Sequence, residues 1–105
     1  VIVAYLGNKV VGFAALVNDS VAENFNESPF LDFLFVEEEY RNRGIATKLV
    51  EKIIDYAREN YNIIYLVTVS HELFYKKLGF EVIDKSTIVD CIDECFIMRK
   101  KIWQL

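Results

Sequence analysis

The chain has 105 residues, of which 53% are hydrophobic and 14% aromatic, a composition that fits one domain with a substantial core. Its formal net charge of -4 argues against sequence-independent nucleic-acid binding, which rests on clustered positive charge. The apolar runs are far shorter than the roughly 20 residues that span a bilayer, so we expect no membrane partner.

Hydrophobic periodicity predicts six strands and two helices. In chain order, the predicted elements are strands over 1–5, 10–17 and 30–36, a helix over 44–59, a strand over 63–69, a helix over 71–78, and strands over 80–83 and 95–102. This order, β-β-β-α-β-α-β-β, predicts an α/β fold with helices packed against a mixed sheet. The long helix between strands 30–36 and 63–69 favours their parallel pairing at the centre of the sheet.

Single residues within these elements carry further expectations. Gly12 marks a bulge or a close approach of two backbones. The strand 30–36 is apolar at nearly every position, which is typical of a strand covered on both faces, and Asp32 is the exception. Ser70 is expected to cap the second helix, and Gly79 to end it.

The ends and the cysteines bear on compartment and completeness. The chain opens at Val1 on a β-rich segment without an initiator methionine, and we interpret it as a single domain over 1–105 that is trimmed at its N-terminus. Its start lacks the pattern of a signal peptide. Cys91 and Cys95 are not spaced as a metal or redox pair, so we expect reduced thiols, a cytoplasmic protein and no metal.

The loop Arg41-Asn42-Arg43-Gly44-Ile45-Ala46 lies between a predicted strand and a predicted helix. The first N–H groups of a helix lack internal partners and carry partial positive charge, so they favour an anion such as phosphate. Gly44 has no Cβ, which lets a ligand approach the backbone, and Arg41 and Arg43 add positive charge. The pattern is neither a P-loop nor a dinucleotide fingerprint. On its own it also fits an ordinary helix start with surface arginines.

Three segments, taken together, resemble the GNAT superfamily of N-acetyltransferases. The loop pattern Arg41-x-x-Gly44-x-Ala46 is similar to that family's Q/R-x-x-G-x-G/A motif. The segment 73–81, LFYKKLGFE, resembles the family's "FYekLGF" segment, and 9–14, KVVGFA, resembles its second and third strands. The resemblance covers nearly the whole chain and implies the GNAT acyl-CoA N-acyltransferase fold. The family's first strand and first two helices have no counterpart here.

The resemblance implies acetyl-CoA as the acyl donor and assigns residues to its binding. The implied cofactor-binding residues are Leu34, Phe35, Val36, Arg41, Asn42, Arg43, Gly44, Ile45, Ala46, Thr47 and Ser70. The loop 41–46 would hold the pyrophosphate of coenzyme A through its backbone N–H groups. The backbone of 34–36 would pair with the pantetheine arm, and Thr47 would reach phosphate oxygens. Ser70 stands near the place where many members have an asparagine.

The resemblance also implies an N-acetyltransferase in which a primary amine attacks the acetyl thioester directly. Tyr75 matches the tyrosine that protonates the leaving thiolate, and a backbone N–H near Val36 would stabilise the tetrahedral intermediate. An alkyl ammonium has a pKa of roughly 10, so a base must deprotonate it. Asp32 is the first candidate because we expect it on one strand face with Leu34 and Val36; alternatively, it caps a nearby backbone or pairs with a lysine.

Several questions stay open at this point. Glu23, the acidic run 37–39 and His71 are weaker candidates for the base. The alternative function is a catalytically weak or inactive acyl-CoA-binding regulatory module. The acceptor is a small-molecule or peptide amine, and the net acidity mildly favours a cationic one. We expect a monomer or a homodimer.

Overall fold

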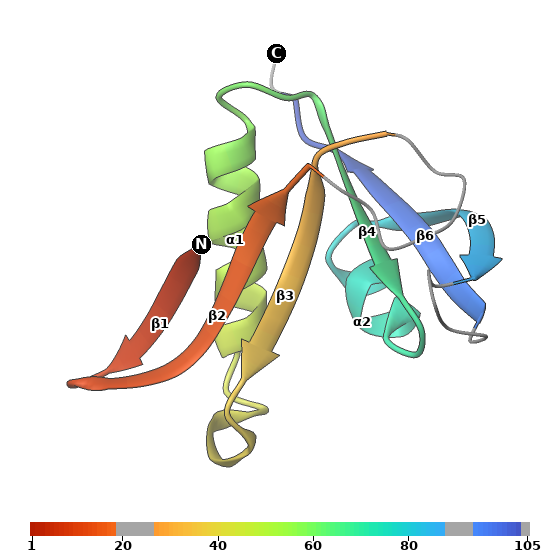
Figure 1. Cartoon of the computed structure of the whole chain (residues 1–105). Coiled ribbons are helices and arrows are strands. Elements are labelled where there is room, and N and C mark those ends of the chain that lie inside the picture. Colours follow the sequence, from red (N-terminus) through yellow and green to blue (C-terminus); the bar gives the residue numbers. More distant parts are fainter. Residues whose placement is uncertain (19–26, 88–93, 104–105) are drawn as a thin grey trace.

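The computed structural model describes residues 1–18, 27–87 and 94–103, in which two helices pack on a single sheet (Figure 1). The elements are β1 (Ile2–Leu6), β2 (Lys9–Val17), β3 (Phe30–Val36), the 3₁₀ turn η1 (Glu38–Tyr40), α1 (Ile45–Ala57), β4 (Ile63–Thr68), α2 (Glu72–Lys77), β5 (Glu81–Thr87) and β6 (Glu94–Lys101). The predicted order is confirmed. Most bounds shift by one or two residues, whereas β5 runs four residues further than predicted.

The sheet has the strand order β1-β2-β3-β4-β6-β5. β3 and β4 are parallel central neighbours, as predicted, because the crossover through α1 returns the chain to the same end of the sheet. Their pairing is short and comprises only Phe30 with Tyr65 and Leu31 with Leu66. Beyond Leu31 the two strands diverge, while β4 pairs with β6 along its whole length (Figure 1).

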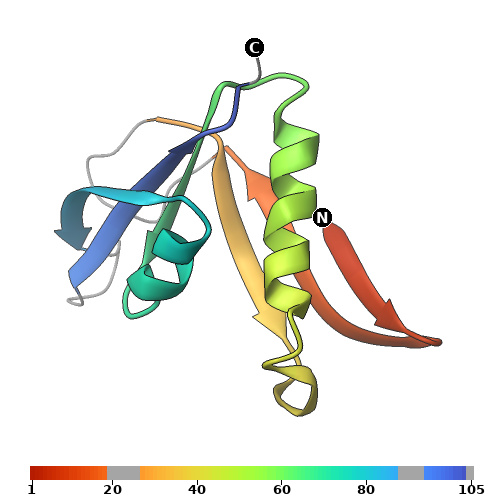
Figure 2. The ribbon, with the colours of Figure 1, turned by 180° about the vertical axis from the view of Figure 1, so that it is seen from behind.

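Both helices lie on the same face of the sheet (Figure 1 and Figure 2). α1 buries one stripe of its surface, as expected of an amphipathic helix; the buried residues are Leu49, Val50, Ile53, Ile54 and Ala57. They join a core that includes Leu31, Ile64 and Met98 from three strands, and α2 adds the partly buried Phe74 and Tyr75. Among the described residues, no helix has the length and apolar character to cross a membrane.

A bulge interrupts the regular alternation of β3. The φ angle of Phe33 is +54°, in the left-handed region, and the β2–β3 register shifts nearby. Ala15 pairs with Asp32, whereas Gly12 pairs with Val36. Gly12 and Ala15 are three positions apart on β2, so they point to opposite faces. Asp32 and Val36 therefore also point to opposite faces.

Two predictions for this strand are wrong because of the bulge. Asp32 does not share a face with Leu34 and Val36, since one extra residue reverses the alternation. The strand is also not covered on both faces. Phe33 and Phe35 are 62% and 41% exposed, and Phe35 lies beside Phe13 on the face away from the helices.

Two predictions about single residues had different outcomes. The close approach at Gly12 is confirmed, because a Cβ there would lie 2.7 Å from the carbonyl oxygen of Phe35. The capping of α2 by Ser70 is wrong: its N-cap is His71, without a side-chain cap. The hydroxyl of Thr68 accepts the His71 N–H at 3.1 Å instead.

Candidate functional site

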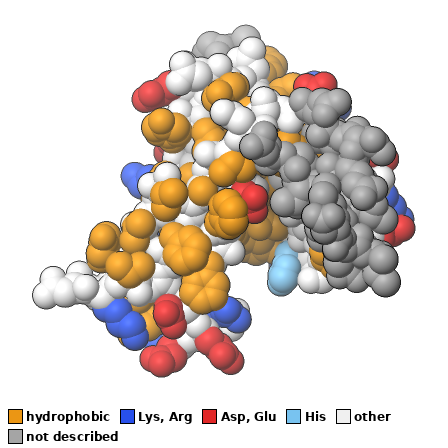
Figure 3. All heavy atoms as spheres, in the orientation of Figure 1, with side chains coloured by type: hydrophobic (Ala, Val, Ile, Leu, Met, Phe, Trp, Pro, Cys, Tyr) orange, Lys and Arg blue, Asp and Glu red, His pale blue; other side chains and the backbone are white. Residues whose placement is uncertain are grey.

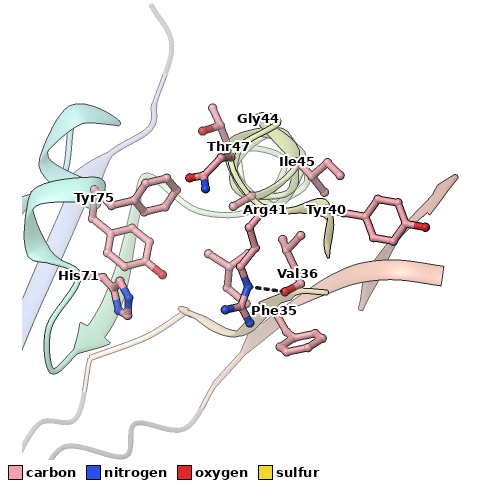
Figure 4. A pocket seen from close by; sticks show the side chains of 13 residues that line it. Phe35, Val36, Tyr40, Arg41, Gly44, Ile45, Thr47, His71 and Tyr75 are labelled. Carbon is pink, nitrogen blue, oxygen red and sulfur yellow. Dashed lines mark hydrogen bonds between the residues drawn. The ribbon is translucent and has the colours of Figure 1, made fainter. Parts of the chain in front are cut away.

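The gap between the diverging β3 and β4 opens into a cavity of about 540 Å³, which is large enough for part of a small-molecule ligand. Its walls come from the end of β3, the loop that leads into α1, and α2 (Figure 4). The lining residues are Leu34, Phe35, Val36, Tyr40, Arg41, Asn42, Gly44, Ile45, Ala46, Thr47, His71, Phe74 and Tyr75.

The start of α1 offers unpaired N–H groups to this cavity. Gly44 is the N-cap, with φ +80°, and the first intrahelical bond runs from the Lys48 N–H to the Gly44 carbonyl at 3.1 Å. The N-cap residue supplies no side-chain hydrogen bond to the first turn of α1, and no acidic residue lies in that turn. A Cβ on Gly44 would meet no atom within 4 Å, so the space before it is open. This combination suits an anion.

The two arginines of the loop point to different places. Arg41 extends from the loop to β3, where its Nε donates to the Val36 carbonyl at 2.8 Å and its guanidinium lies 5.8 Å from the ring centre of Phe35 (Figure 4). The guanidinium of Arg43 lies 5.2 Å from the ring centre of Tyr40, and Arg43 does not line the cavity. Both side chains are therefore engaged with aromatic rings or backbone beside the loop.

Tyr75 enters the cavity from α2, on the side opposite Arg41 (Figure 4). The helix ends as predicted at Gly79, which has φ +94°. The Phe80 N–H donates to the Tyr75 carbonyl at 3.1 Å, and the Gly79 N–H to Lys76, the bond pair of a Schellman motif. The rings of Phe74 and Phe80 pack edge-on against Tyr75 at 5.1 and 5.9 Å. The segment 73–81 thus fixes the position of the tyrosine ring.

The environment of Tyr75 keeps its hydroxyl protonated. Burial, and to a lesser degree the negative charge of Asp32, raise the pKa of Tyr75 from 10.0 to about 12. The phenol is therefore a hydrogen-bond and proton donor throughout the physiological range. Asp32 itself does not line the cavity.

Asp32 lies on the face of the sheet away from the helices. Its Oδ1 accepts the N–H of Phe33 at 2.7 Å, so it caps the bulge, as one of the two interpretations of the sequence proposed. The same face of the sheet carries the exposed side chains of Phe13 and Phe35, which pair across β2 and β3 with ring centres 5.4 Å apart. Figure 3 shows this apolar face and the chain's single histidine, His71, in the hollow beside it.

The cavity collects most, but not all, of the residues predicted for the site. Ser70 is exposed, and its hydroxyl lies 3.4 Å from the ring of His71. Tyr40 and Phe74 line the cavity without having been predicted, although they immediately precede Arg41 and Tyr75, which were. Glu23 and Cys91 lie outside the described residues, and Cys95 is buried in β6. Within the described part of the chain, no cluster of acidic, histidine or cysteine side chains is suited to a metal.

Comparison with known proteins places the chain among acetyltransferases by sequence. Residues 1–82 match the family model of the acetyltransferase (GNAT) domain. The chain is also 34% identical over 85 residues to an uncharacterized N-acetyltransferase of Methanocaldococcus jannaschii. That alignment covers 75% of this chain and 38% of the relative, so the chain corresponds to well under half of the relative's length.

Solved structures share the fold. A Bacillus anthracis protein crystallised with acetyl coenzyme A superposes with a TM-score of 0.76 at 24% identity, over 94% of this chain and 60% of that one. A GNAT family acetyltransferase from Elizabethkingia anophelis with acetyl-CoA bound gives 0.78 at 18% identity, over 94% and 73%. The predicted fold class is therefore confirmed.

We predict that Gly44→Ala lowers both stability and coenzyme A affinity. A side chain in the left-handed region costs roughly 1–2 kcal/mol, and its Cβ would occupy the open space before the N–H groups. Gly7→Ala is the matched control, because Gly7 has φ +63°, equally open surroundings and a place outside the cavity. Thermal melts should show similar losses for both variants, whereas calorimetry should show weakened binding for Gly44→Ala alone. Equal affinities would contradict the assignment of the loop.

Proposed function

Because the chain belongs to the GNAT acetyltransferase family, we propose that it is an acetyl-CoA-dependent N-acetyltransferase acting on a primary amine of a small molecule or peptide. The observation that carries this proposal is the cavity itself. Within the described residues it joins an uncapped helix N-terminus, a strand edge that is unpaired beyond Leu31 and a protonated tyrosine, which are the three features that a phosphate, a pantetheine arm and a leaving thiolate need. Relatives of this fold crystallised with acetyl-CoA support the choice of donor.

The donor would lie along the gap between β3 and β4. The N–H groups at the start of α1 would hold the pyrophosphate, helped by the helix dipole. The edge of β3 that faces the gap would pair with the amides of the pantetheine arm as a neighbouring strand does. This arrangement brings the thioester between Val36 and Tyr75, which line the same cavity.

The reaction then requires one base and one acid. The amine must lose a proton before or while its nitrogen attacks the thioester carbonyl, and Asp32 is the carboxylate near the gap that we assign to this role. Collapse of the tetrahedral intermediate breaks the carbon–sulfur bond. Tyr75 donates its proton to the departing thiolate, so that the products are the amide and coenzyme A.

The first test is binding of acetyl-CoA to the purified chain. A ligand that binds only the folded state stabilises it by RT ln(1 + [L]/Kd), which is about 2.7 kcal/mol at a concentration of 100 Kd. We therefore expect the melting temperature to rise by several degrees with acetyl-CoA and less with adenosine. An unchanged melting temperature at saturating acetyl-CoA would refute the proposed function.

Tyr75→Phe should lower kcat while leaving coenzyme A affinity nearly unchanged. Loss of general acid catalysis costs about 100-fold or more, and phenylalanine preserves the packing against Phe74 and Phe80. Since the pKa of about 12 keeps Tyr75 protonated, it should cause no loss of activity up to about pH 10. Release of free thiol in a screen of primary amines measures both, with Tyr56→Phe as an exposed control. Binding without turnover in the wild type would favour a regulatory module.

Asp32→Asn should lower kcat by about 100-fold if its carboxylate is the base. The asparagine keeps the size of the side chain and can still accept the Phe33 N–H. Asp84→Asn is the matched control, because Asp84 likewise accepts the N–H of the next residue, Lys85, at 2.8 Å and lies outside the cavity. Full activity of Asp32→Asn would remove Asp32 from the mechanism.

A further inference from the structure

The peptide that follows Val36 has a defined orientation at the edge of the gap. The Glu37 N–H donates to the Val11 carbonyl of β2 at 2.8 Å. A trans peptide directs its C=O away from its N–H, so the Val36 carbonyl points away from β2 and toward the gap. Hydrogen-bonded and non-hydrogen-bonded pairs alternate along an antiparallel ladder. In the next pair, Gly12 with Val36, the Val36 N–H therefore also points toward the gap.

Divergence from β4 removes the strand that would pair with this edge. The β3–β4 pairing ends at Leu31, five residues before Val36. An unpaired backbone carbonyl is costly when it is shielded from water. Arg41 supplies the missing partner, since its Nε donates to the Val36 carbonyl at 2.8 Å (Figure 4).

We infer that Arg41 is a positioning residue: by occupying the Val36 carbonyl, its Nε leaves the Val36 N–H as the polar group that β3 presents to the acetyl carbonyl. Without that bond, an acceptor lone pair and a donor would face the thioester side by side. This inference rests on the proposed function and deepens it. It assigns the arginine side chain to the acyl end of the site instead of the phosphates.

The geometry favours this role over a general electrostatic one. Arg41 leaves the loop and reaches β3, and its guanidinium lies over the ring of Phe35, away from the start of α1. The chain uses the same bond elsewhere. Arg58, the C-cap of α1, donates its Nε to the carbonyl of Ile102 just after β6 at 3.0 Å, at the opposite end of α1 from the cavity.

Two neutral substitutions separate the hydrogen bond from the charge. Arg41→Gln carries an amide N–H as many bonds from Cα as Nε, whereas Arg41→Met has similar length and no donor. Both remove the positive charge. We would measure the dissociation constants of acetyl-CoA and of coenzyme A for each variant by calorimetry, and compare the ratio of the coenzyme A constant to the acetyl-CoA constant, which falls when acetyl-CoA binding alone is weakened. Only acetyl-CoA carries the carbonyl that would accept the Val36 N–H.

Arg41→Met should weaken acetyl-CoA binding about three- to tenfold more than coenzyme A binding, the change expected for one hydrogen bond. Arg41→Gln should keep the wild-type ratio. Arg58→Met is the control for a purely structural loss. It removes an equivalent bond, so it should lower the melting temperature without changing the ratio.

Three results would overturn the inference. Equal ratios in Arg41→Gln and Arg41→Met, both below the wild-type ratio, would show that the positive charge, and not the hydrogen bond, sets the preference for acetyl-CoA. Parallel losses of affinity for both ligands would place the side chain at the phosphates, and wild-type behaviour of both variants would show that the bond is unimportant. If Arg41→Met does not fold, a lowered ratio in Arg41→Gln alone contradicts the inference. Failure of the wild type to bind either ligand refutes the proposed function instead.

Discussion

The site depends on how briefly β3 and β4 pair. Two residue pairs hold the strands together, and immediately beyond them the bulge at Phe33 bends β3 away while β6 keeps β4 fully paired. A continuous ladder would bury the edge of β3 against its neighbour and leave no cavity. The divergence instead exposes backbone donors and acceptors in the middle of the sheet, where a ligand can use them. The core beneath stays closed because α1 packs across β1, β2 and β3.

On each side of the gap, a glycine in the left-handed conformation fixes one end of a helix. On one side, Gly44 takes the left-handed conformation that starts α1 with its N–H groups toward the cavity. On the other side, Gly79 takes the same conformation to end α2, and the resulting bond from Phe80 to the Tyr75 carbonyl fixes the tyrosine. The order of residues in the segment 73–81 thus has a physical reason. The hydrophobic contact between Phe80 and Tyr75 is the contact that this helix ending usually brings.

The sequence was sufficient for the parts of the structure that local patterns determine. Strand and helix periods, the parallel crossover, the glycine that starts α1 and the glycine that ends α2 follow from residues close together in the chain. The bulge at Phe33 does not, because nothing in a run that is apolar at every position but Asp32 marks where one residue is extra. Its consequence, that Asp32 changes face, was therefore missed. The hydrogen bond from Arg41 to the Val36 carbonyl could not be predicted either, since an arginine beside an anion-binding loop can equally well pair with the anion.

Because the bulge turns Asp32 to the other face of β3, Asp32 and Tyr75 approach the gap from opposite sides, which suits the base and the acid that we propose. Asp32 lies on the face away from the helices and Tyr75 comes from the helix side, so amine and thiolate would meet at the gap from opposite faces. After the larger effect of burial, the negative charge of Asp32 also contributes to the raised pKa of Tyr75. An ammonium beside Asp32 offsets that charge, which lowers the pKa of the phenol and makes it a stronger acid. Binding of the amine substrate would thus make Tyr75 a better proton donor to the thiolate. Burial would still keep the phenol protonated until the thiolate departs.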